Sequence, residues 1–475
     1  MNIARTDFHA IGDELCDLPA TEQVRMITGR EVSARELLAA HLARIEALNP
    51  SLNAVVGTDF DVAEQKADAV DELVARGERP GPLAGLVTAH KDLVETADFV
   101  TSHGSPLFAG HRPKTDALLV SRMAAAGAVA LGKTNTPEFG AGSHTFNPVY
   151  GTTRNPYDHS RTCGGSSGGA AVAVRTGMVT VADGSDFGGS LRNPAAWNNV
   201  VGFRSSPRVI PRTGVGNLWN PMPIDGPMAR TVDDLALLFR VMAQPSLEDP
   251  LSHRLEIPPV ISPATTGRDG RPMRVAWSAT LGGLPVEPDV AAVLERFRDD
   301  LAILGWDVVE DEPDMSGTDE VFVTLRAFSF SRLAELGDGI TSLKETVQDE
   351  IRRGLALSSA EITAAYAQLN VLWKRAIEFF TRYDLMIAPV TQVSPFPINQ
   401  EYPTEVNGTA MGSYIEWMRS CCRITSFGVP AMSLPAGFTE AGLPVGAQLI
   451  GRPFGDIALL RAAKALEATS GHGSR

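Results

Sequence analysis

The chain has 475 residues, of which 44% are hydrophobic and 21% are charged, a composition typical of a globular protein with a large buried core. Its formal net charge of −14 excludes a basic surface of the kind that binds nucleic acid. The four cysteines and nine histidines lack the spacing of metal ligands, so we expect no metal and no other cofactor.

The sequence also lacks the patterns of export and membrane insertion. No uninterrupted apolar run approaches the ~18 residues that indicate a transmembrane helix. The first residues carry acidic side chains early and contain no apolar region of a signal peptide. We therefore expect a cytoplasmic protein that contacts neither a membrane nor nucleic acid.

Helical and strand-like patterns alternate along most of the chain. A capping box, in which Ser33 precedes Glu36 by three positions, predicts the start of an early helix. Helical spacing of apolar residues is found at 37–48, 62–77, 116–127, 289–305 and 457–471, and the segment 318–381 is expected to be mostly helical. Short apolar segments predict strands at 52–56, 83–92, 128–134, 273–278, 306–311, 383–389 and 430–437.

This alternation predicts an α/β fold with a central sheet that is mixed but mostly parallel and is covered by helices on both faces. We expect one domain over residues 1–475, because the Pro-rich stretch 245–272 is interpreted as a connection between two lobes of one fold. The parts of this domain are an N-terminal helical region at about 1–80, a core at about 81–245, and a second part of the core at about 273–470, with the helical layer at about 318–381.

Glycine and serine cluster twice within residues 163–195. A flexible linker is excluded, because the apolar segment 170–183 between the clusters is expected to be buried. A phosphate-binding loop has little support, since the first cluster lacks the Gly-Lys-Ser/Thr ending of such loops. A loop that presents a serine nucleophile remains as the third interpretation.

A nucleophilic serine needs a base within hydrogen-bond reach. Gly164 to Gly168 fits the G-x-S-x-G pattern of α/β-hydrolases, with Ser166 as nucleophile, but only His253 and His472 follow it. Lys91 is the alternative base, because burial at the end of the strand predicted at 83–92 would lower its pKa. Its position alone also fits an ordinary lysine at a strand end.

Three spaced motifs resemble those of one enzyme family. Lys91 lies in LAGLVTAHKD, Ser166 in GGSSGG and Ser190 in GSDFGGSLRNPA, which together resemble the Ser–cis-Ser–Lys triad of the amidase signature family. The resemblance extends in family order over roughly residues 20–470, through the segments 134–139, 146–158, 226–238 and 428–456.

The resemblance implies a role for each residue of the motifs. Lys91 is the implied base, Ser166 the bridging serine after a cis peptide bond, and Ser190 the nucleophile. An oxyanion hole is implied for the main-chain N–H groups of the turn at Phe187, Gly188, Gly189 and Ser190. The flanking residues Asp186 and Arg192 are expected to hold this turn by hydrogen bonds and charge pairing.

The resemblance implies cleavage of a carbon–nitrogen acyl bond in a small-molecule substrate. The small residues Gly140, Ala141 and Gly142 predict room for an aryl or bulky acyl group, and Trp219 is a candidate pocket wall. Amides, anilides and hydrazides fit such a site. The alternatives are the A subunit of a glutamyl-tRNA amidotransferase and an α/β-hydrolase-type esterase that uses Ser166. Members of the family are often dimers, so a homodimer is a further expectation.

Two features depart from the commonest family pattern. Phe187 stands where threonine or isoleucine is frequent, so a bulky ring is placed beside the nucleophile. His90 precedes Lys91 where the usual proline is missing. Since successive strand residues face opposite sides, we expect His90 to point away from the Lys91 side chain. These departures concern specificity rather than activity.

Overall fold

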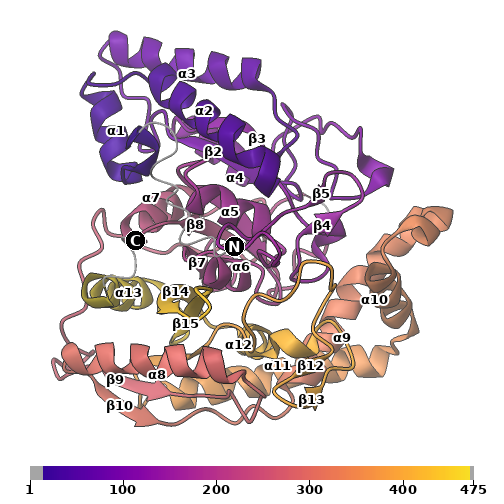
Figure 1. Ribbon diagram of the computed structural model, residues 1–475. Helices are drawn as coiled ribbons and strands as arrows, with labels where there is room; N and C mark the ends of the chain where they lie inside the picture. Colours follow the sequence, from indigo (N-terminus) through magenta and orange to yellow (C-terminus); the bar gives the residue numbers. More distant parts are fainter. Residues whose placement is uncertain (1–13, 215, 471–475) are drawn as a thin grey trace.

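The structure is a computed structural model that describes residues 14–214 and 216–470 (Figure 1). The other residues lie outside this description, among them His472, Gly471 of the predicted last helix, and residues 1–13 of the N-terminal region. No helix in the described part of the chain is long and apolar enough to cross a membrane.

The N-terminal helices form one end of the molecule, beside a sheet of three short strands (Figure 1). The Ser33–Glu36 capping box is formed, and it starts α2. The helices are α1 (Ala20–Thr28), α2 (Ala34–Leu52) and α3 (Phe60–Ala75). The strands run in the order β1 (Val55–Val56), β3 (Val129–Thr134) and β2 (Val87–Lys91). The strand predicted at 52–56 is therefore shorter, because Leu52 still belongs to the helix.

Eight strands form the large central sheet. Their order is β10 (Asp307–Glu310), β9 (Arg274–Trp277), β11 (Leu385–Pro389), β15 (Pro444–Gly451), β14 (Ala431–Phe438), β7 (Val201–Arg204), β8 (Ile224–Ala229) and β6 (Ala182–Asp186). The sheet is mixed, as predicted, but the expectation that it is mostly parallel is wrong. Only β10–β9 and β9–β11 pair in parallel, and every other adjacent pair in this sheet is antiparallel. The sequence patterns missed β6, β7, β8 and β15, which carry most of the antiparallel pairing.

Strand β2 of the small sheet lies alongside edge strand β6 of the large one. The main-chain N–H of Thr180 donates to the carbonyl of Val87 at 2.9 Å, and Thr88 Oγ1 donates to the carbonyl of Val181 at 2.9 Å. These contacts advance in the same direction along both segments, so the carboxyl ends of β2 and β6 lie together. Lys91, the last residue of β2, is thereby placed at the end of β6.

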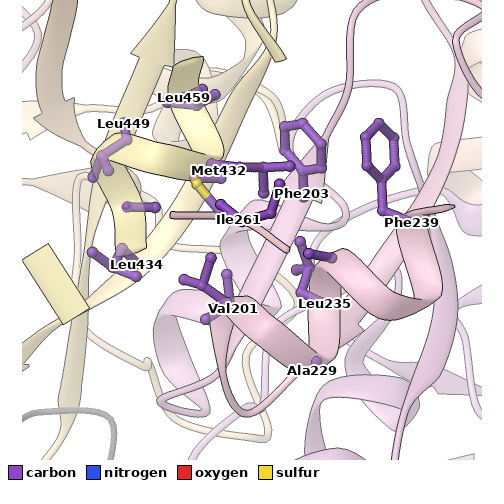
Figure 2. Packing of buried hydrophobic residues seen from close by; sticks show 14 of the residues in the cluster. Val201, Phe203, Ala229, Leu235, Phe239, Ile261, Met432, Leu434, Leu449 and Leu459 are labelled. Atoms are coloured by element: carbon purple, nitrogen blue, oxygen red, sulfur yellow. The ribbon is translucent and has the colours of Figure 1, made fainter. Parts of the chain in front are cut away.

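Helices cover the sheet and seal a hydrophobic core (Figure 2). Helix α7 (Val232–Met242) contributes Leu235 and Phe239, and the ring of Phe239 meets that of Phe203 edge-on at 5.1 Å. Residues from β14 and β15, including Met432 and Leu449, complete this cluster. The core fixes the sheet, and the sheet in turn fixes the strand ends at which the predicted site lies.

Residues 318–381 are mostly helical, as predicted. They contain α9 (Thr318–Phe330), a 3-10 segment (Ser331–Ser342), α10 (Glu345–Ala356) and α11 (Ser359–Phe379). The remaining helices are α4 (Leu118–Ala125), α5 (Gly168–Arg175), α6 (Arg192–Trp197), α8 (Pro288–Ile303), α12 (Arg419–Phe427) and α13 (Asp456–Ser470). Two small hairpins join β4 (Phe146–Asn147) to β5 (Gly151–Thr152) and β12 (Glu405–Val406) to β13 (Thr409–Ala410).

Candidate active site

Lys91 is a fully buried lysine surrounded by serine hydroxyls. Its Nζ atom lies 2.7 Å from Ser166 Oγ, 2.9 Å from Ser167 Oγ and 3.0 Å from Ser185 Oγ. Burial disfavours the ammonium form and lowers the pKa of Lys91 to about 7, although the carboxylates of Asp225 and Asp186 act in the opposite direction. The amine therefore exchanges its proton in the neutral pH range, as a general base requires.

The first glycine–serine cluster places Ser166 against this lysine. The peptide bond between Gly165 and Ser166 is cis, as the family resemblance implied. The carbonyl groups before it are held from outside the cluster, since Thr145 Oγ1 donates to Gly164 O at 2.8 Å and Ser143 Oγ to Gly165 O at 2.6 Å. The segment is thus a bend held by hydrogen bonds.

The main-chain N–H groups of the same cluster argue against a phosphate-binding loop. The N–H of Ser167 donates to the carbonyl of Ser190 at 3.2 Å, and the N–H of Gly169 to that of Asn135 at 3.2 Å. Groups that already have acceptors within the protein are not free to bind an anion.

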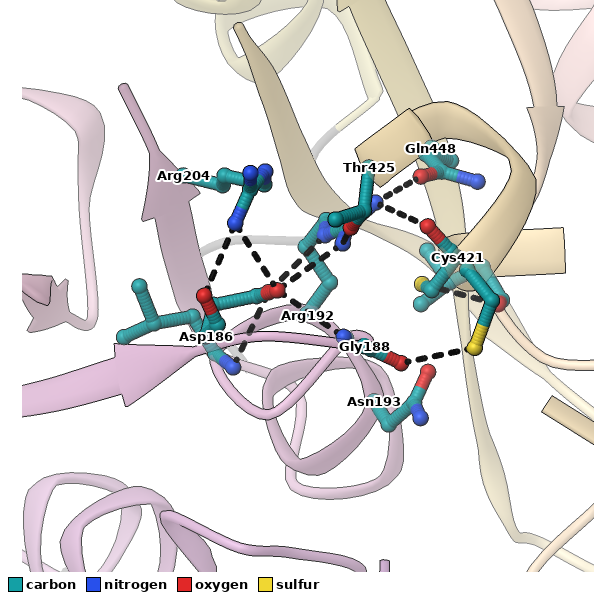
Figure 3. A network of polar contacts seen from close by, with 12 residues as sticks. Asp186, Gly188, Arg192, Asn193, Arg204, Cys421, Thr425 and Gln448 are labelled. Carbon is teal, nitrogen blue, oxygen red and sulfur yellow. Dashed lines mark hydrogen bonds and ion pairs between the residues drawn. The ribbon is translucent and has the colours of Figure 1, made fainter. Parts of the chain in front are cut away.

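The second cluster forms a turn after β6 (Figure 3). Ser190 is the last residue of this turn. The Asp186 carboxylate accepts the N–H of Gly189 at 2.9 Å and is held by Arg192 through Nε at 2.9 Å and a terminal nitrogen at 3.0 Å. Arg204 donates to the Asp186 carbonyl at 2.8 Å. Asp186 and Arg192 therefore hold the turn, which confirms the role predicted for them.

The charges of this network decide its protonation state. Burial alone would raise the pKa of the Asp186 carboxyl, but the Arg192 and Arg204 guanidinium groups hold it well below its usual range. Arg192 also reaches Gln448 Oε1 at 2.6 Å and Thr425 Oγ1 at 2.9 Å, which ties the turn to β15 and α12 (Figure 3). Asp186 is thus a permanent anion that fixes the turn.

The glycines of the turn are required by its geometry. Gly189 has a φ of +111°, and a Cβ atom there would lie 2.6 Å from Cys421 Cβ. A Cβ atom at Gly188 would lie 2.6 Å from the ring of Phe322. The N–H groups of Phe187, Gly188 and Ser190 have no acceptor among the described residues, whereas the N–H of Gly189 is used by Asp186. Gly189 is therefore the member of the predicted oxyanion hole whose N–H is already engaged.

Ser166 and Ser190 both line a cavity of about 770 Å³. Gly140 lies in its wall, as predicted, but Ala141, Gly142 and Trp219 do not. Ala141 is fully buried in a hydrophobic cluster behind the wall, and its carbonyl accepts Lys344 Nζ at 2.7 Å. The Trp219 side chain is 67% exposed and points to solvent rather than into the cavity, whose wall is formed here by its neighbour Leu218.

The two histidines considered from the sequence have other roles. His90 Nδ1 lies 2.6 Å from Asp183 Oδ1, while the other oxygen of this carboxylate accepts the main-chain N–H of Lys91 at 3.2 Å. His90 therefore supports the end of β2 through Asp183. His253 packs edge-on against Phe454 and is absent from the cavity wall, so it cannot serve Ser166 as a base.

Several residues of the site escaped the sequence analysis. Ser167 and Ser185 both contact the Lys91 amine, and neither contact was predicted from the sequence. Ser185 lies on β6, and recognition of this strand would have placed it near Lys91. The polar sequence ADGSD does not have the apolar pattern of a strand, so β6 was not predicted. Within residues 14–214 and 216–470 no group of histidine, cysteine and acidic side chains could hold a metal ion.

Known proteins with the same organisation are numerous. The sequence profile of the amidase family matches residues 36–460. The chain is 35% identical to the A subunit of a glutamyl-tRNA(Gln) amidotransferase from Anaeromyxobacter sp. (strain K), over 96% of this chain and 97% of the relative. It is 33% identical to an acylamidase of Rhodococcus erythropolis, over 95% of each chain.

Solved structures agree with these relatives. A bacterial aryl acylamidase of the amidase signature family superposes with a TM-score of 0.88 at 26% identity, over 96% of each chain. The structure and the family profile agree. The motifs around Lys91, Ser166 and Ser190 meet where β2 of the small sheet lies beside β6 of the large one, and the profile matches most of the chain. The protein is a member of the amidase signature family and a hydrolase of carbon–nitrogen amide bonds.

Proposed function

We propose that this enzyme hydrolyses small amides with an aryl or bulky acyl group, through an acyl-enzyme on Ser190 and a proton relay from Ser190 through Ser166 to Lys91. The observation that carries the proposal is the 2.7 Å contact of the buried Lys91 amine with Ser166, beside a cavity that also exposes Ser190. A buried amine with a pKa of about 7 is roughly half neutral at pH 7, and this neutral fraction supports the first proton transfer.

The hydrogen-bond donors and acceptors around Lys91 support proton transfer from Ser166 to the amine. A neutral amine has two N–H donors and one lone pair, and here it meets three hydroxyl groups. The Ser167 hydroxyl donates to the Ser185 carbonyl at 3.3 Å, so it accepts from the amine. With Ser185 as the second acceptor, the lone pair of Lys91 is left to receive the proton of Ser166.

The proposed reaction has two steps, acylation of Ser190 and hydrolysis of the acyl-enzyme. Ser190 Oγ bonds to the amide carbon as its proton passes to Ser166 and that of Ser166 passes to Lys91. The carbon–nitrogen bond breaks as the same proton returns through Ser166 to the leaving nitrogen. Water hydrolyses the acyl-enzyme by the same route. The unengaged N–H groups of Phe187, Gly188 and Ser190 are the donors proposed for the oxyanion.

The cavity wall supports an aryl acyl group. Phe139, Phe187, Phe328 and Phe330 line it together with several leucines, and aromatic rings of a substrate pack favourably against such a surface. The acylamidase relative and the aryl acylamidase structure carry names that agree with amide hydrolysis.

A second candidate function is that of the A subunit of a glutamyl-tRNA amidotransferase, because relatives of that name match nearly the whole chain. Such a protein would release ammonia from glutamine within a complex. The two candidates differ in what the isolated chain hydrolyses.

The test is steady-state hydrolysis by the purified chain of benzamide, benzhydrazide, an anilide, a short aliphatic amide and glutamine. Ser190→Ala and Lys91→Ala are assayed beside it, with His253→Ala as the matched control outside the cavity. We expect turnover of the aryl substrates that both site variants abolish and the control retains. Hydrolysis of glutamine alone would favour the amidotransferase function, and wild-type rates in Ser190→Ala would overturn the mechanism.

A further inference from the structure

Arg326 of α9 is a buried cation in the cavity wall that the proposed mechanism does not use. Its side chain is only 4% exposed. The Nε atom donates to the Tyr414 hydroxyl at 2.8 Å, and that hydroxyl donates to Glu350 Oε1 at 2.8 Å. This chain of hydrogen bonds, which joins segments distant in sequence, fixes the orientation of the guanidinium group.

Aromatic rings also pack against the Arg326 guanidinium group. The guanidinium carbon of Arg326 lies 4.7 Å from the ring centroid of Phe330 and 5.6 Å from that of Phe187. Both rings line the cavity, and Phe187 directly precedes the turn that carries Ser190. Arg326 is therefore close to the proposed reaction centre and is held in place without a ligand.

The terminal nitrogens of Arg326 have no hydrogen-bond acceptor in the described part of the chain. Glu350 does not supply one, since its nearest oxygen is 3.8 Å from Nε and accepts the Tyr414 hydroxyl instead. Burial would lower the pKa of Arg326, but Tyr414 and Glu350 raise it, so the group stays charged. A charged, planar fork of donors in a cavity wall matches the two oxygens of a carboxylate.

The other arginines of the wall are engaged or exposed. Arg208 donates to the carbonyls of Leu218 and Asn220, at 2.6 and 2.7 Å. Arg212 donates to Asp225 Oδ2 at 3.1 Å, and Arg332 is exposed. Arg326 is thus the buried cation of this wall whose terminal donors lack acceptors among the described residues.

We propose that Arg326 binds a carboxylate carried by the substrate and so makes the enzyme selective for acidic amides over neutral ones of the same shape. The inference rests on the proposed amide hydrolysis. The carboxylate would lie between the rings of Phe187 and Phe330 and accept hydrogen bonds from both terminal nitrogens of the guanidinium. Arg326 is then a specificity-determining residue that contacts the substrate away from the bond that breaks.

The experiment compares para-carboxybenzamide with para-methylbenzamide, and para-carboxyacetanilide with para-methylacetanilide. Each pair exchanges a carboxylate for a methyl group, on the acyl side in the first pair and on the amine side in the second. We expect the wild type to have a higher kcat/KM, through a lower KM, for the acid of at least one pair. Preference for the methyl compound in both pairs would overturn the inference.

The variants Arg326→Gln and Arg326→Lys test the residue itself. A hydrogen bond to a charged group contributes about 1.5–3 kcal/mol, so Arg326→Gln should lower kcat/KM for the acid by roughly 10- to 100-fold and leave the methyl compound nearly unchanged. Arg326→Lys should recover part of the loss. An equal loss for both compounds would overturn the inference, as would a selective loss confined to Arg332→Gln. Arg352→Gln on the exposed face of α10 is the matched control.

A binding measurement separates this inference from the proposed function. Calorimetric titration of Ser190→Ala with para-carboxybenzamide should show binding that the added Arg326→Gln change weakens by a similar factor. Such binding without any turnover by the wild type would overturn the proposed function and retain the inference. Binding that is unaffected by Arg326→Gln would overturn the inference and leave the proposed function intact.

Discussion

The Asp186 carboxylate accepts the main-chain N–H of Gly189 at 2.9 Å, so a buried charge fixes the turn that carries Ser190. The same carboxylate is held in a bidentate manner by Arg192 and approached by Arg204 at 3.4 Å. None of these three side chains is more than a few per cent exposed. The position of the proposed nucleophile therefore depends on charges that do not themselves react.

Asp186→Asn tests this dependence. The amide keeps the size of the side chain but leaves two buried arginines without their counter-ion. Breaking a buried ion pair from one side costs about 3–5 kcal/mol, and we expect a loss of that order in the free energy of unfolding, measured with urea. We also expect kcat to fall, because the Gly189 contact that shapes the turn is weakened.

Asp158→Asn is the matched control, since the Asp158 side chain is 41% exposed and bonds only its neighbours Ser160 and Arg161 among the described residues. It should change stability by less than about 0.5 kcal/mol. A similar small change in Asp186→Asn would mean that the buried network does not hold the turn.

The pH dependence of kcat/KM should report the ionisation of Lys91. Its pKa is lowered to about 7 by burial, and only the neutral amine can take the proton of Ser166. The sign follows directly: kcat/KM is low below this pKa, rises as pH increases through it and levels off above it. Initial rates at low substrate concentration between about pH 5 and 9 give the profile. An enzyme with unchanged kcat/KM from pH 5 to 7 would exclude Lys91 as the base.

Most of the site could be predicted because the motifs of Lys91, Ser166 and Ser190 together resemble one family, although each motif alone left alternatives open. The sheet was harder to predict. Strand β6 has the polar sequence ADGSD, which lacks the apolar pattern of a strand although most of it is buried. Its place beside β2 is set by tertiary contacts, and so the approach of Ser185 to Lys91 could not be predicted from local sequence.

The substrate pocket was the least predictable part. Trp219 suggested a wall because large apolar residues are usually buried, but its backbone turn directs Leu218 inward instead. Arg326 gave no signal in the sequence, because an arginine on a helix is ordinarily exposed. Its burial depends on Tyr414 and Phe187, which are distant in the chain and meet it only in the folded protein.

Trp219→Ala should have little effect. The side chain is 67% exposed and lies outside the cavity wall, so we expect the free energy of unfolding to change by less than about 0.5 kcal/mol. The KM for aryl amides should stay within about twofold of the wild-type value, which corresponds to less than about 0.5 kcal/mol of binding energy. A large rise in KM confined to aryl substrates would show that Trp219 contacts the substrate in the pocket.

Gly140→Ala should damage catalysis more than stability. A Cβ atom at Gly140 would lie 3.3 Å from Ser166 Oγ and 2.9 Å from Leu93 Cδ1, in a backbone with a φ of +70°. Leu93 can rotate, and an alanine in the left-handed region costs about 1–2 kcal/mol, which sets the expected loss of stability. The crowded Ser166 hydroxyl is the proposed relay, so we expect kcat to fall by at least about tenfold, which is roughly 1.4 kcal/mol of barrier.

Gly110→Ala provides the comparison for this change, because a Cβ atom there meets nothing within 4 Å and the backbone is not in the left-handed region. It should leave both kcat and the unfolding midpoint near the wild-type values. Steady-state kinetics and thermal unfolding of the two variants, measured side by side, separate backbone strain from crowding of the hydroxyl. If Gly140→Ala lost stability but kept its kcat, the methyl group would not disturb the proton path, and the placement of Ser166 as the relay would be wrong.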